Sequence, residues 1–391
     1  MFSQAEVMAL RGRPAPFADG ELADSLAPLG SSRMLPRQAY ADPVVFAWEQ
    51  ANFFSGWVCT GRATDDLVEP GSRRAVGIGG STVLLVRGED GLLRAFANVC
   101  RHRGHELLPC GGSARKRAIV CPYHGWSYRL DGSLLNAPGF RDVEGFAPEG
   151  LGLVEMPLAE WHSWVFVDPS REAGAFAAHV GALEDIVKPY APESLTVTTT
   201  HEYEVAANWK VIVENYQECY HCTLIHPELC QVSPPDSGET LDLPGDWVGG
   251  WMDLKPAVET MSLDGRSQGA TIATLDDHGK AAVMYASVFP NLLVSLHPDY
   301  VMTHRLTPLA PDATRIECAW LFPAEVAAAD GFDPAYAVDF WDLTNRQDWA
   351  ACESVQRGFG SPLQVSGPLA PAEDGVQHFV SRIARGYLLQ P

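Results

Sequence analysis

Two short segments decide the fold: Cys100-Arg-His-Arg-Gly104 and Cys121-Pro-Tyr-His-Gly-Trp126. Each places one cysteine and one histidine close together, and each ends in residues that suit a tight turn. Thiolates and imidazoles at such short spacing are the side chains that bind transition metals in proteins. The two segments therefore predict a metal centre held by two loops of a β-rich region.

Two kinds of metal centre use two cysteines and two histidines. A structural zinc site binds all four side chains tetrahedrally, whereas in a Rieske [2Fe-2S] cluster the cysteines hold one iron and the histidines the other. One ligand of each kind per loop, with Trp126 as an apolar cover, favours the cluster. His105 and Cys110 also lie in the first loop, but their spacings match no second pair, and we interpret them as non-ligands.

A second group of metal-ligand residues follows downstream. Apolar residues recur at intervals of three and four between 208 and 220, which predicts a helix with Glu214, Glu218 and His221 on one stripe. His226 lies five residues beyond His221, a spacing that would separate the two imidazoles by about 140° on a regular helix. The helix should therefore distort or end between them, unlike the His-Glu-x-x-His pattern of zinc proteases.

Asp348 is the candidate for a third ligand. The last strong helix is predicted over 335–357 with Gly358 as its C-cap, and Asp348 falls on the buried face of that helix. A buried carboxylate needs compensation, and two histidines with one carboxylate bind one face of Fe(II) and leave positions open. The competing interpretations are a core histidine at 221, a loop histidine at 226 and a buried, hydrogen-bonded Asp348.

The motifs lie in two regions that differ in their predicted secondary structure. Residues 1–40, rich in Pro, Gly, Ser and Ala, predict an arm, and a helix is expected over 44–57. The first region should then hold short strands at 81–86, 93–98, 119–121 and 164–168, before a domain junction near 170–185. The second should hold a strand at 196–205 and an antiparallel sheet between 281 and 322. The predicted fold class is α+β.

Composition excludes several classes of protein. The 391 residues carry 49 acidic and 28 basic side chains, a formal net charge of −21, so nucleic acid is not an expected partner. Nine scattered cysteines do not suggest a disulfide framework and favour a reducing compartment. No apolar run approaches the ~20 residues of a membrane span, and no signal peptide is visible. We expect a cytoplasmic protein without a membrane partner.

The two cysteine-histidine motifs resemble the Rieske domain of the Rieske non-heme iron oxygenases, in the alpha subunit of their oxygenase component. The stretch from Asn208 to His226 resembles the mononuclear-iron motif of that family, and the segment around Asp348 resembles its segment with the carboxylate ligand. The resemblance covers the chain from about Leu35 to Gly358. It implies an N-terminal arm (1–40) packed on the catalytic domain, a β-rich Rieske [2Fe-2S] domain (41–170), and a helix-grip catalytic domain with an antiparallel sheet (171–391).

The same resemblance implies roles for individual residues. The [2Fe-2S] cluster would be bound by Cys100, His102, Cys121 and His124, and the mononuclear Fe(II) by His221, His226 and Asp348. Glu218 would be the acid that links a cluster-ligating histidine of one subunit to an iron-ligating histidine of its neighbour in a homotrimer. The sequence has neither a dinucleotide fingerprint nor a ferredoxin motif, which implies a separate NAD(P)H-dependent flavin and iron-sulfur reductase.

Two features indicate the substrate. Glu218 stands where most of the family has Asp. A glutamate at this position and the segment 260–265 resemble the corresponding residues of the family members that act on quaternary ammonium compounds. We therefore expect a terminal oxygenase that uses O2 to hydroxylate or N-demethylate a betaine-like substrate. The expected pocket aromatics are Trp247, Trp251, Tyr285 and Phe289, with Tyr300 and Trp320 in the same region. The alternatives are a ring-hydroxylating dioxygenase acting on an aromatic compound, and a non-enzymatic electron-transfer or zinc-stabilised protein.

Overall fold

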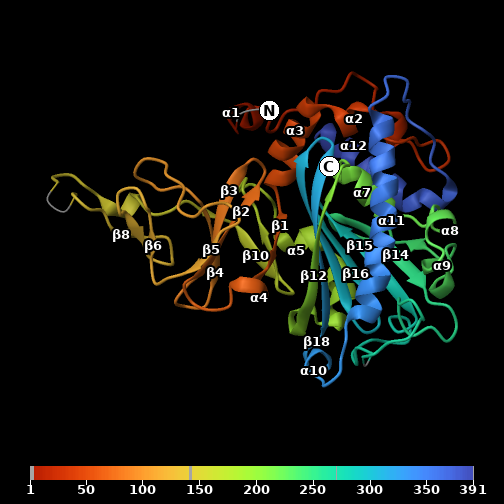
Figure 1. The fold of residues 1–391 in the computed structure, drawn as a ribbon. Helices are drawn as coiled ribbons and strands as arrows, with labels where there is room; N and C mark the ends of the chain where they lie inside the picture. The colour runs from red at the N-terminus through yellow and green to blue at the C-terminus, as the bar shows by residue number, and fades with distance from the viewer. Residues whose placement is uncertain (1–3, 141–142, 270, 391) are drawn as a thin grey trace. The chain divides into compact units, whose positions relative to one another are not determined.

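The computed structural model describes residues 4–140, 143–269 and 271–390. The chain divides into two compact units (Figure 1). One consists of 12–48 and 177–390, and the other consists of 49–176 together with the segment before Gly12. The predicted domain bounds of 1–40, 41–170 and 171–391 stay predictions. No helix in the described ranges is both long and apolar enough to cross a membrane.

The smaller unit is built from antiparallel strands. Its five-stranded sheet has the order β5 (Ser113–Arg115), β2 (Ser72–Ile78), β3 (Ser81–Arg87), β4 (Leu93–Ala97), β9 (Glu155–Met156). A three-stranded sheet joins β1 (Val58–Arg62), β11 (Trp164–Val167) and β10 (Leu158–Trp161), and another joins β6 (Ile119–Val120), β7 (Ser127–Tyr128) and β8 (Leu134–Asn136). The four strands predicted in this region are confirmed.

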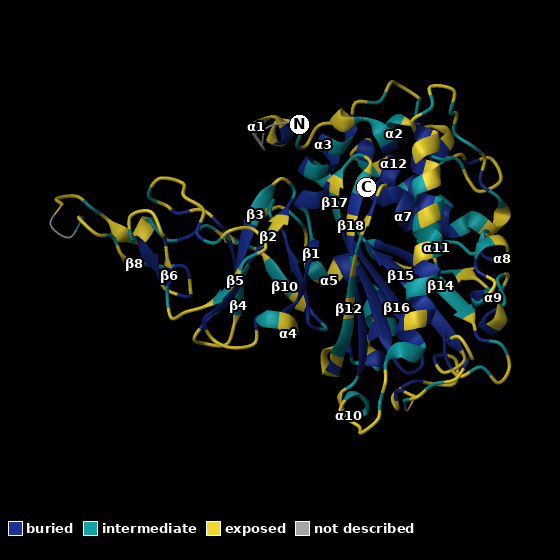
Figure 2. Cartoon of the chain, in the orientation of Figure 1, coloured by how far each residue is buried: buried dark blue, intermediate teal, exposed yellow. Residues whose placement is uncertain are grey.

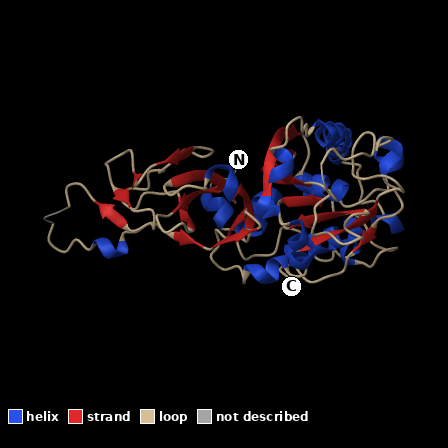
Figure 3. Ribbon diagram, turned by 90° about the horizontal axis from the view of Figure 1, so that it is seen from below, coloured by secondary structure: helices blue, strands red, loops and turns tan. Residues whose placement is uncertain are grey.

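A seven-stranded antiparallel sheet forms the centre of the larger unit. Its order is β12 (Leu195–Val205), β18 (Ala313–Pro323), β17 (Val301–Ala310), β16 (Leu292–Leu296), β15 (Ala282–Val288), β14 (Trp247–Asp253), β13 (Glu239–Thr240). The predicted strand and sheet are thus confirmed, and Figure 3 shows the strands in red. Ile316, Cys318, Trp320 and Phe322, which alternate along β18, are all fully buried. Figure 2 shows buried residues in dark blue along the strands of this sheet.

Helix α11 (Ala335–Phe359) lies along this sheet, in contact with β12 and with α7 (Trp209–Tyr216) (Figure 1). Its apolar side chains pack against those of β17 and β18 in one hydrophobic cluster. The predicted C-cap at Gly358 is wrong, because the helix continues to Phe359 and the cap is Gly360. The last turn is held in place by Phe359, whose ring is stacked on Tyr40 at a centroid distance of 4.2 Å.

Helix α7 begins where it was predicted and ends earlier. Asn208 is its N-cap, and the side-chain oxygen accepts a hydrogen bond from the backbone N–H of Lys210. The helix ends at Tyr216, so Glu218 and His221 do not share a helical stripe with Glu214. The cause is local: the Glu218 carboxylate accepts the backbone N–H of His221 at 3.1 Å and thereby stabilises a turn in place of the helix.

One amphipathic helix was not predicted. Helix α12 (Asp374–Tyr387) buries its apolar residues at intervals of three and four: Val376, Phe379, Val380, Ile383, Ala384 and Tyr387. This is the usual signal of a helix that packs on a core, so the information was present in the sequence. The helix contacts α7 and β14, and its first residue lies at the cavity described below.

Candidate functional site

The two cysteine-histidine loops of the smaller unit have the same backbone geometry. Cys100 donates its N–H to the carbonyl five residues on, at His105, and Cys121 does the same to Trp126, both at 2.8 Å. The backbone N–H of Gly104 donates to the carbonyl of Cys100, and that of Gly125 donates to the carbonyl of Cys121. Both glycines have a positive φ, 74° and 72°, which L side chains rarely adopt. The chain therefore builds two matching loops.

The matching loops bring the four predicted ligands together. The two thiols are buried, each 2% exposed, while the imidazoles lie further out, with ring centroids 4.8 Å apart. Two inner thiols and two outer imidazoles fit the donor set of a Rieske [2Fe-2S] cluster, in which each type of ligand holds its own iron. His105 hydrogen-bonds to the carbonyl of Glu106, and Cys110 is exposed.

Two aromatic residues support these loops. The Trp126 ring lies parallel to His102, with centroids 4.9 Å apart and planes 5° from parallel. Tyr128 lies two residues beyond the second motif. Its hydroxyl is 3.2 Å from the thiol sulfur of Cys100 and accepts the backbone N–H of Arg101. Burial and the Cys100 contact raise the pKa of Tyr128, so the hydroxyl keeps its proton. It can donate that proton to a thiolate, a contact that tunes cluster potentials.

The larger unit brings His221, His226 and Asp348 to one point. His221 and His226 flank the one-turn helix α8 (Cys222–Ile225), as its N-cap and its C-cap, and Asp348 comes from the middle of α11. One ligand atom of each residue lies within 4.8 Å of the others. A carboxylate oxygen of Asp348 is 2.8 Å from Nε2 of His226 and 3.4 Å from Nε2 of His221. The predicted helix ends at Tyr216, before both histidines, and the short helix between them ends at Ile225, so no single regular helix carries the two imidazoles.

Each of these histidines has an acceptor on its other ring nitrogen. The Nδ1 atom of His221 is 2.5 Å from a carboxylate oxygen of Glu218, and the Nδ1 atom of His226 is 2.7 Å from the side-chain oxygen of Gln347. Such acceptors fix the tautomer that presents Nε2 to a metal. Gln347 was not predicted, because only the fold shows that its side chain reaches His226.

The charges of this cluster stabilise one another. Burial opposes the ionised form of Asp348, but hydrogen bonds from His221 and His226 outweigh burial and lower its pKa. Burial also opposes a charged His221, yet its bonds to Asp348 and Glu218 raise its pKa to about 9. In the metal-free chain the imidazole therefore holds a proton that a metal ion must displace. Neutral imidazoles and a carboxylate form the donor set of Fe(II) sites.

A disulfide joins Cys219 to Cys222, next to His221. This single bond joins residues three apart, so it does not form the kind of disulfide framework that the scattered cysteines argue against. Cys100 and Cys121, the predicted cluster ligands, are free thiols.

A cavity of about 310 Å³ opens on the three candidate ligands. Aromatic rings form much of its wall: Tyr216, Trp251, Tyr285, His304, Trp341 and Trp349. Neighbouring rings meet edge to face. The rings of Tyr216 and Tyr285 are 5.7 Å apart at 78°, Tyr285 and Trp341 are 6.2 Å apart at 68°, and His304 and Trp349 are 6.1 Å apart at 90°. Aromatic faces in this arrangement form a cage suited to a bulky cation.

Of the expected pocket aromatics, Trp251 and Tyr285 line the cavity. Trp247 is on the same strand, but its indole N–H donates to the carbonyl of Pro244, and Phe289 packs against Trp209 and Arg382. Tyr300 and Trp320 belong to the hydrophobic cluster. The wall residues that were missed include Trp341, two helical turns before Asp348 on the same face of α11, a spacing visible in the sequence.

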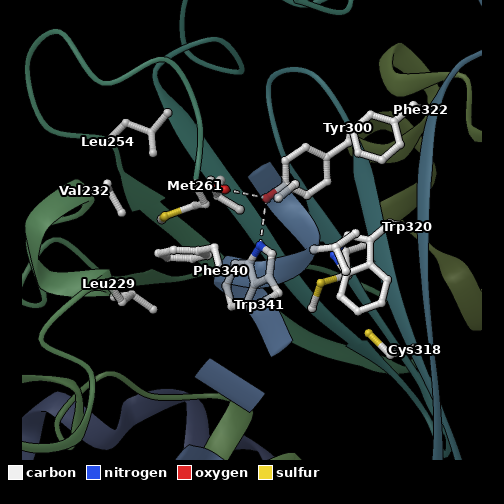
Figure 4. Packing of buried hydrophobic residues seen from close by; sticks show 14 of the residues in the cluster. Leu229, Val232, Leu254, Met261, Tyr300, Cys318, Trp320, Phe322, Phe340 and Trp341 are labelled. Carbon is white, nitrogen blue, oxygen red and sulfur yellow. Dashed lines mark hydrogen bonds between the residues drawn. The ribbon is translucent and has the colours of Figure 1, made fainter. Parts of the chain in front are cut away.

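Tyr300 fixes the position of Trp341 in the cavity wall. Its hydroxyl accepts the indole N–H of Trp341 at 2.7 Å and donates to the carbonyl of Met261 at 2.9 Å (Figure 4). Met261 belongs to the segment 260–265 that was singled out from the sequence. That segment therefore acts on the cavity indirectly, through Tyr300.

We expect Tyr300→Phe to destabilise the larger unit and loosen the wall. The variant leaves a buried indole N–H and a buried carbonyl without a partner, a loss of about 2 kcal/mol and a fall in melting temperature of about 4–8 °C for a unit of this size. Thermal unfolding measures the effect. Tyr190→Phe is the matched control, because that buried hydroxyl has no hydrogen-bond partner in the described structure. Equal melting temperatures for both variants would contradict the role of Tyr300.

His304 is the polar member of the wall. It is 2% exposed, and burial lowers its pKa to about 4, so the ring is neutral. Its Nε2 atom is 3.1 Å from the side-chain oxygen of Asn345, while Nδ1 has no protein partner in the described chain. The hydroxyl of Tyr285 and the indole nitrogen of Trp349 are likewise buried without a partner among the described residues.

Comparison with known proteins identifies the family. The family described as "Ring hydroxylating alpha subunit (catalytic domain)" matches residues 192–388, and "Rieske [2Fe-2S] domain" matches residues 56–147. The chain is 30% identical to the glycine betaine monooxygenase oxygenase subunit of Chromohalobacter salexigens, over 94% of this chain and 88% of that protein. It is 38% identical to the carnitine monooxygenase oxygenase subunit of Acinetobacter pittii, over 49% of this chain and 52% of that protein.

A solved structure shares the whole fold. It is a quaternary ammonium Rieske monooxygenase, and its description names carnitine oxidation and inter-subunit electron transfer. Its sequence is 25% identical to this chain, and its fold matches with a TM-score of 0.78 over 96% of this chain and 100% of that one. Naphthalene 1,2-dioxygenase from Rhodococcus sp. shares the fold at 19% identity and a TM-score of 0.75. The paired loops, the three-residue cluster and these matches show that the chain belongs to the Rieske non-heme iron oxygenases, oxidoreductases with a Rieske [2Fe-2S] cluster and a mononuclear iron.

Proposed function

We propose that the chain is the terminal oxygenase of a system that oxygenates an N-methyl group of a quaternary ammonium compound, a betaine or a close analogue. The observation that carries the proposal is the aromatic-walled cavity that opens on His221, His226 and Asp348. Glycine betaine and carnitine monooxygenases among the relatives point to the same class of substrate. A quaternary ammonium group has no N–H to donate, so aromatic faces and nearby negative charge are what can bind it.

We assign the metal ligands as follows. Cys100, His102, Cys121 and His124 hold the [2Fe-2S] cluster, and His221, His226 and Asp348 hold the mononuclear Fe(II). These centres supply single electrons and an open-faced metal at which O2 is reduced. The residues of the chain bind and position the reactants. Glu218 and Gln347 hold the two imidazoles in the required tautomer, and the ring wall places an N-methyl group beside the metal and excludes bulk water.

The net reaction is balanced by two electrons from outside the chain. An N-methyl C–H bond, O2, two electrons and two protons give an N-hydroxymethyl group and water. The hydroxymethyl compound then breaks its C–N bond, releases formaldehyde and leaves a tertiary amine and a proton. Hydroxylation and N-demethylation are therefore one process at a methyl group.

The assembly belongs to the same proposal. Glu218 would connect the iron site of one subunit to the cluster of a neighbour in a homotrimer, because electron transfer between two centres needs a short bonded path. A separate NAD(P)H-dependent flavin and iron-sulfur reductase would supply the electrons, in the cytoplasm.

Metal analysis and product analysis test the proposal together. Purified protein should be brown, with Rieske-type absorption bands and about three irons per chain, two in the cluster and one in the triad. With a surrogate reductase and a quaternary ammonium substrate it should release formaldehyde in step with O2 uptake. Colourless, zinc-loaded protein would contradict the assignment. Formation of a cis-diol from an aromatic compound would instead support the ring-hydroxylating alternative, which the relatives do not favour.

Gln347→Leu should weaken iron binding without affecting the cluster. The change removes the acceptor of the Nδ1–H of His226, and loss of such a partner lowers metal affinity about 10–100-fold. Titration of the metal-free triad with Fe(II) measures the affinity. Gln347→Glu keeps an acceptor oxygen and should restore tight binding. Unchanged affinity in Gln347→Leu would show that His226 is held by its surroundings alone.

A further inference from the structure

The Cys219–Cys222 disulfide lies within the segment that carries two of the proposed iron ligands. It joins the residue after Glu218 to the residue after His221, and both cysteines line the cavity of the triad. Cys222 is 3% exposed, whereas Cys219 is half-buried. Cys219 is therefore the cysteine of this pair that is more accessible to a small molecule.

The disulfide closes the same turn that positions His221. The Cα atoms of Cys219 and Cys222 are 4.9 Å apart, and the N–H of Cys222 donates to the carbonyl of Cys219 at 3.1 Å. Within this turn the Glu218 carboxylate bonds to His221 through both oxygens, to the backbone N–H at 3.1 Å and to Nδ1 at 2.5 Å. In the disulfide form, both oxygens of Glu218 thus contact the histidine of its own chain.

The proposed electron path requires one more contact from Glu218, with a cluster-ligating histidine of a neighbouring subunit. A carboxylate has about four acceptor positions, but two bonds to one residue fix its direction. The covalent link between Cys219 and Cys222 prevents the turn from relaxing. Without that link only hydrogen bonds hold the turn, so the carboxylate gains freedom to rotate toward a second donor.

The compartment expected for this chain makes a permanent bond at this place unexpected. Disulfides in reducing compartments are usually transient and act in catalysis or in redox sensing. A third cysteine, Cys230, lies close by, and its thiol donates to the carbonyl of Cys222 at 3.4 Å. All three cysteines pack in one hydrophobic cluster, but the disulfide joins only Cys219 and Cys222.

We propose that Cys219 and Cys222 form a reversible redox switch, in which the dithiol is the active form and the disulfide slows electron transfer to the iron. The inference rests on the proposed function and adds a regulation of its site. The oxidant is hydrogen peroxide, which forms when O2 takes up two electrons and two protons without oxygenating a substrate. Peroxide released by the oxygenase then stops the reaction that produces it.

The chemistry of the switch is balanced in two steps. The sulfur of Cys219 breaks the O–O bond of hydrogen peroxide, which gives a sulfenic acid and one water. The sulfur of Cys222 then displaces the sulfenic oxygen as a second water, and the S–S bond forms. Two thiols are oxidised and one peroxide is reduced. A dithiol reductant such as dithiothreitol reverses the change by thiol–disulfide exchange and is itself oxidised to a disulfide.

The test compares two forms of the iron-loaded oxygenase, one treated with hydrogen peroxide and one with dithiothreitol. Alkylation and mass spectrometry of the peptide that contains residues 219–222 show which thiols are free, and visible spectra and iron analysis check that both metal centres remain. Stopped-flow reoxidation of the reduced cluster, with O2 and a quaternary ammonium substrate present, measures electron transfer. We expect the disulfide form to be slower at least about 10-fold, and dithiothreitol to restore the rate.

Two serine variants locate the effect. Cys219→Ser cannot form the disulfide and should keep the fast rate after peroxide treatment. Cys230→Ser removes the neighbouring thiol and should stay as sensitive to peroxide as the unchanged protein. The two forms of the unchanged protein decide the inference even if a variant fails to fold.

Equal rates for the disulfide and dithiol forms would overturn the inference, as would peroxide treatment that leaves both thiols of the 219–222 peptide free. Either result leaves the proposed function intact. The proposed function fails instead if the dithiol form, with both metal centres present, releases formaldehyde from no quaternary ammonium compound.

Discussion

Asp348→Ala is expected to abolish turnover while the absorption bands of the [2Fe-2S] cluster remain unchanged. The substitution removes the only carboxylate of the proposed triad and leaves two imidazoles, which together bind Fe(II) weakly. The iron content should fall from about three to about two per chain. Activity should fall below about one thousandth of that of the unchanged protein, because O2 activation needs the metal. Iron analysis, visible spectra and formaldehyde release measure the three effects.

Asp342→Ala is the matched control for this experiment. Asp342 is also on α11, but it accepts hydrogen bonds from Tyr203 and Arg346 and lies outside the cavity lining of the described chain. This variant should keep about three irons per chain and most of its activity. If Asp348→Ala retained its third iron or its turnover, the ligand assignment on α11 would be wrong.

Glu218→Gln is expected to keep both metal centres and to slow turnover. The amide has the shape of the carboxylate and can still accept the Nδ1–H of His221, now at 2.5 Å from Glu218. It lacks the negative charge that stabilises a positively charged imidazole during electron transfer. We expect kcat to fall about 10–100-fold, with little change in iron content. Stopped-flow reoxidation of the reduced cluster, with substrate and O2 present, reports the slowed step.

Glu214→Gln, four residues earlier on α7, is the control. Burial raises the pKa of Glu214 to about 8, with Tyr40 donating a hydrogen bond to it, so the side chain is largely protonated at neutral pH. An amide is then a close replacement, and the rate of cluster reoxidation should not change. An unchanged rate in Glu218→Gln as well would remove Glu218 from the electron path.

The segments that carry the proposed ligands can be recognised from the sequence for a physical reason. Cys100 and His102 lie within one turn, as do Cys121 and His124, so the chain brings each pair together through local hydrogen bonds alone. The spacing between His221 and His226 also limits the local structure to a broken helix. The end of α7 was misplaced, because the capping contact of Glu218 with the His221 N–H competes with helix propagation.

The cavity wall could not be predicted in the same way. Tyr216, Tyr285, His304 and Trp349 come from two helices and two strands, and nothing in their sequence spacing relates them. Trp247 and Trp251 are four residues apart on one strand, yet only Trp251 reaches the cavity. The role of Gln347 could not be predicted either. Its contact with His226 depends on how α11 packs against the segment of His226, and tertiary contacts determine that packing.

The most direct test of the account is the stoichiometry of the reaction catalysed by the reconstituted oxygenase. O2 uptake and formaldehyde are measured in the same sample with a quaternary ammonium substrate, and mass spectrometry identifies the amine that remains. We expect one formaldehyde and one amine lacking a methyl group for each O2 consumed, with no measurable product from Asp348→Ala. O2 uptake that yields no oxygenated or demethylated amine from any quaternary ammonium compound would contradict it.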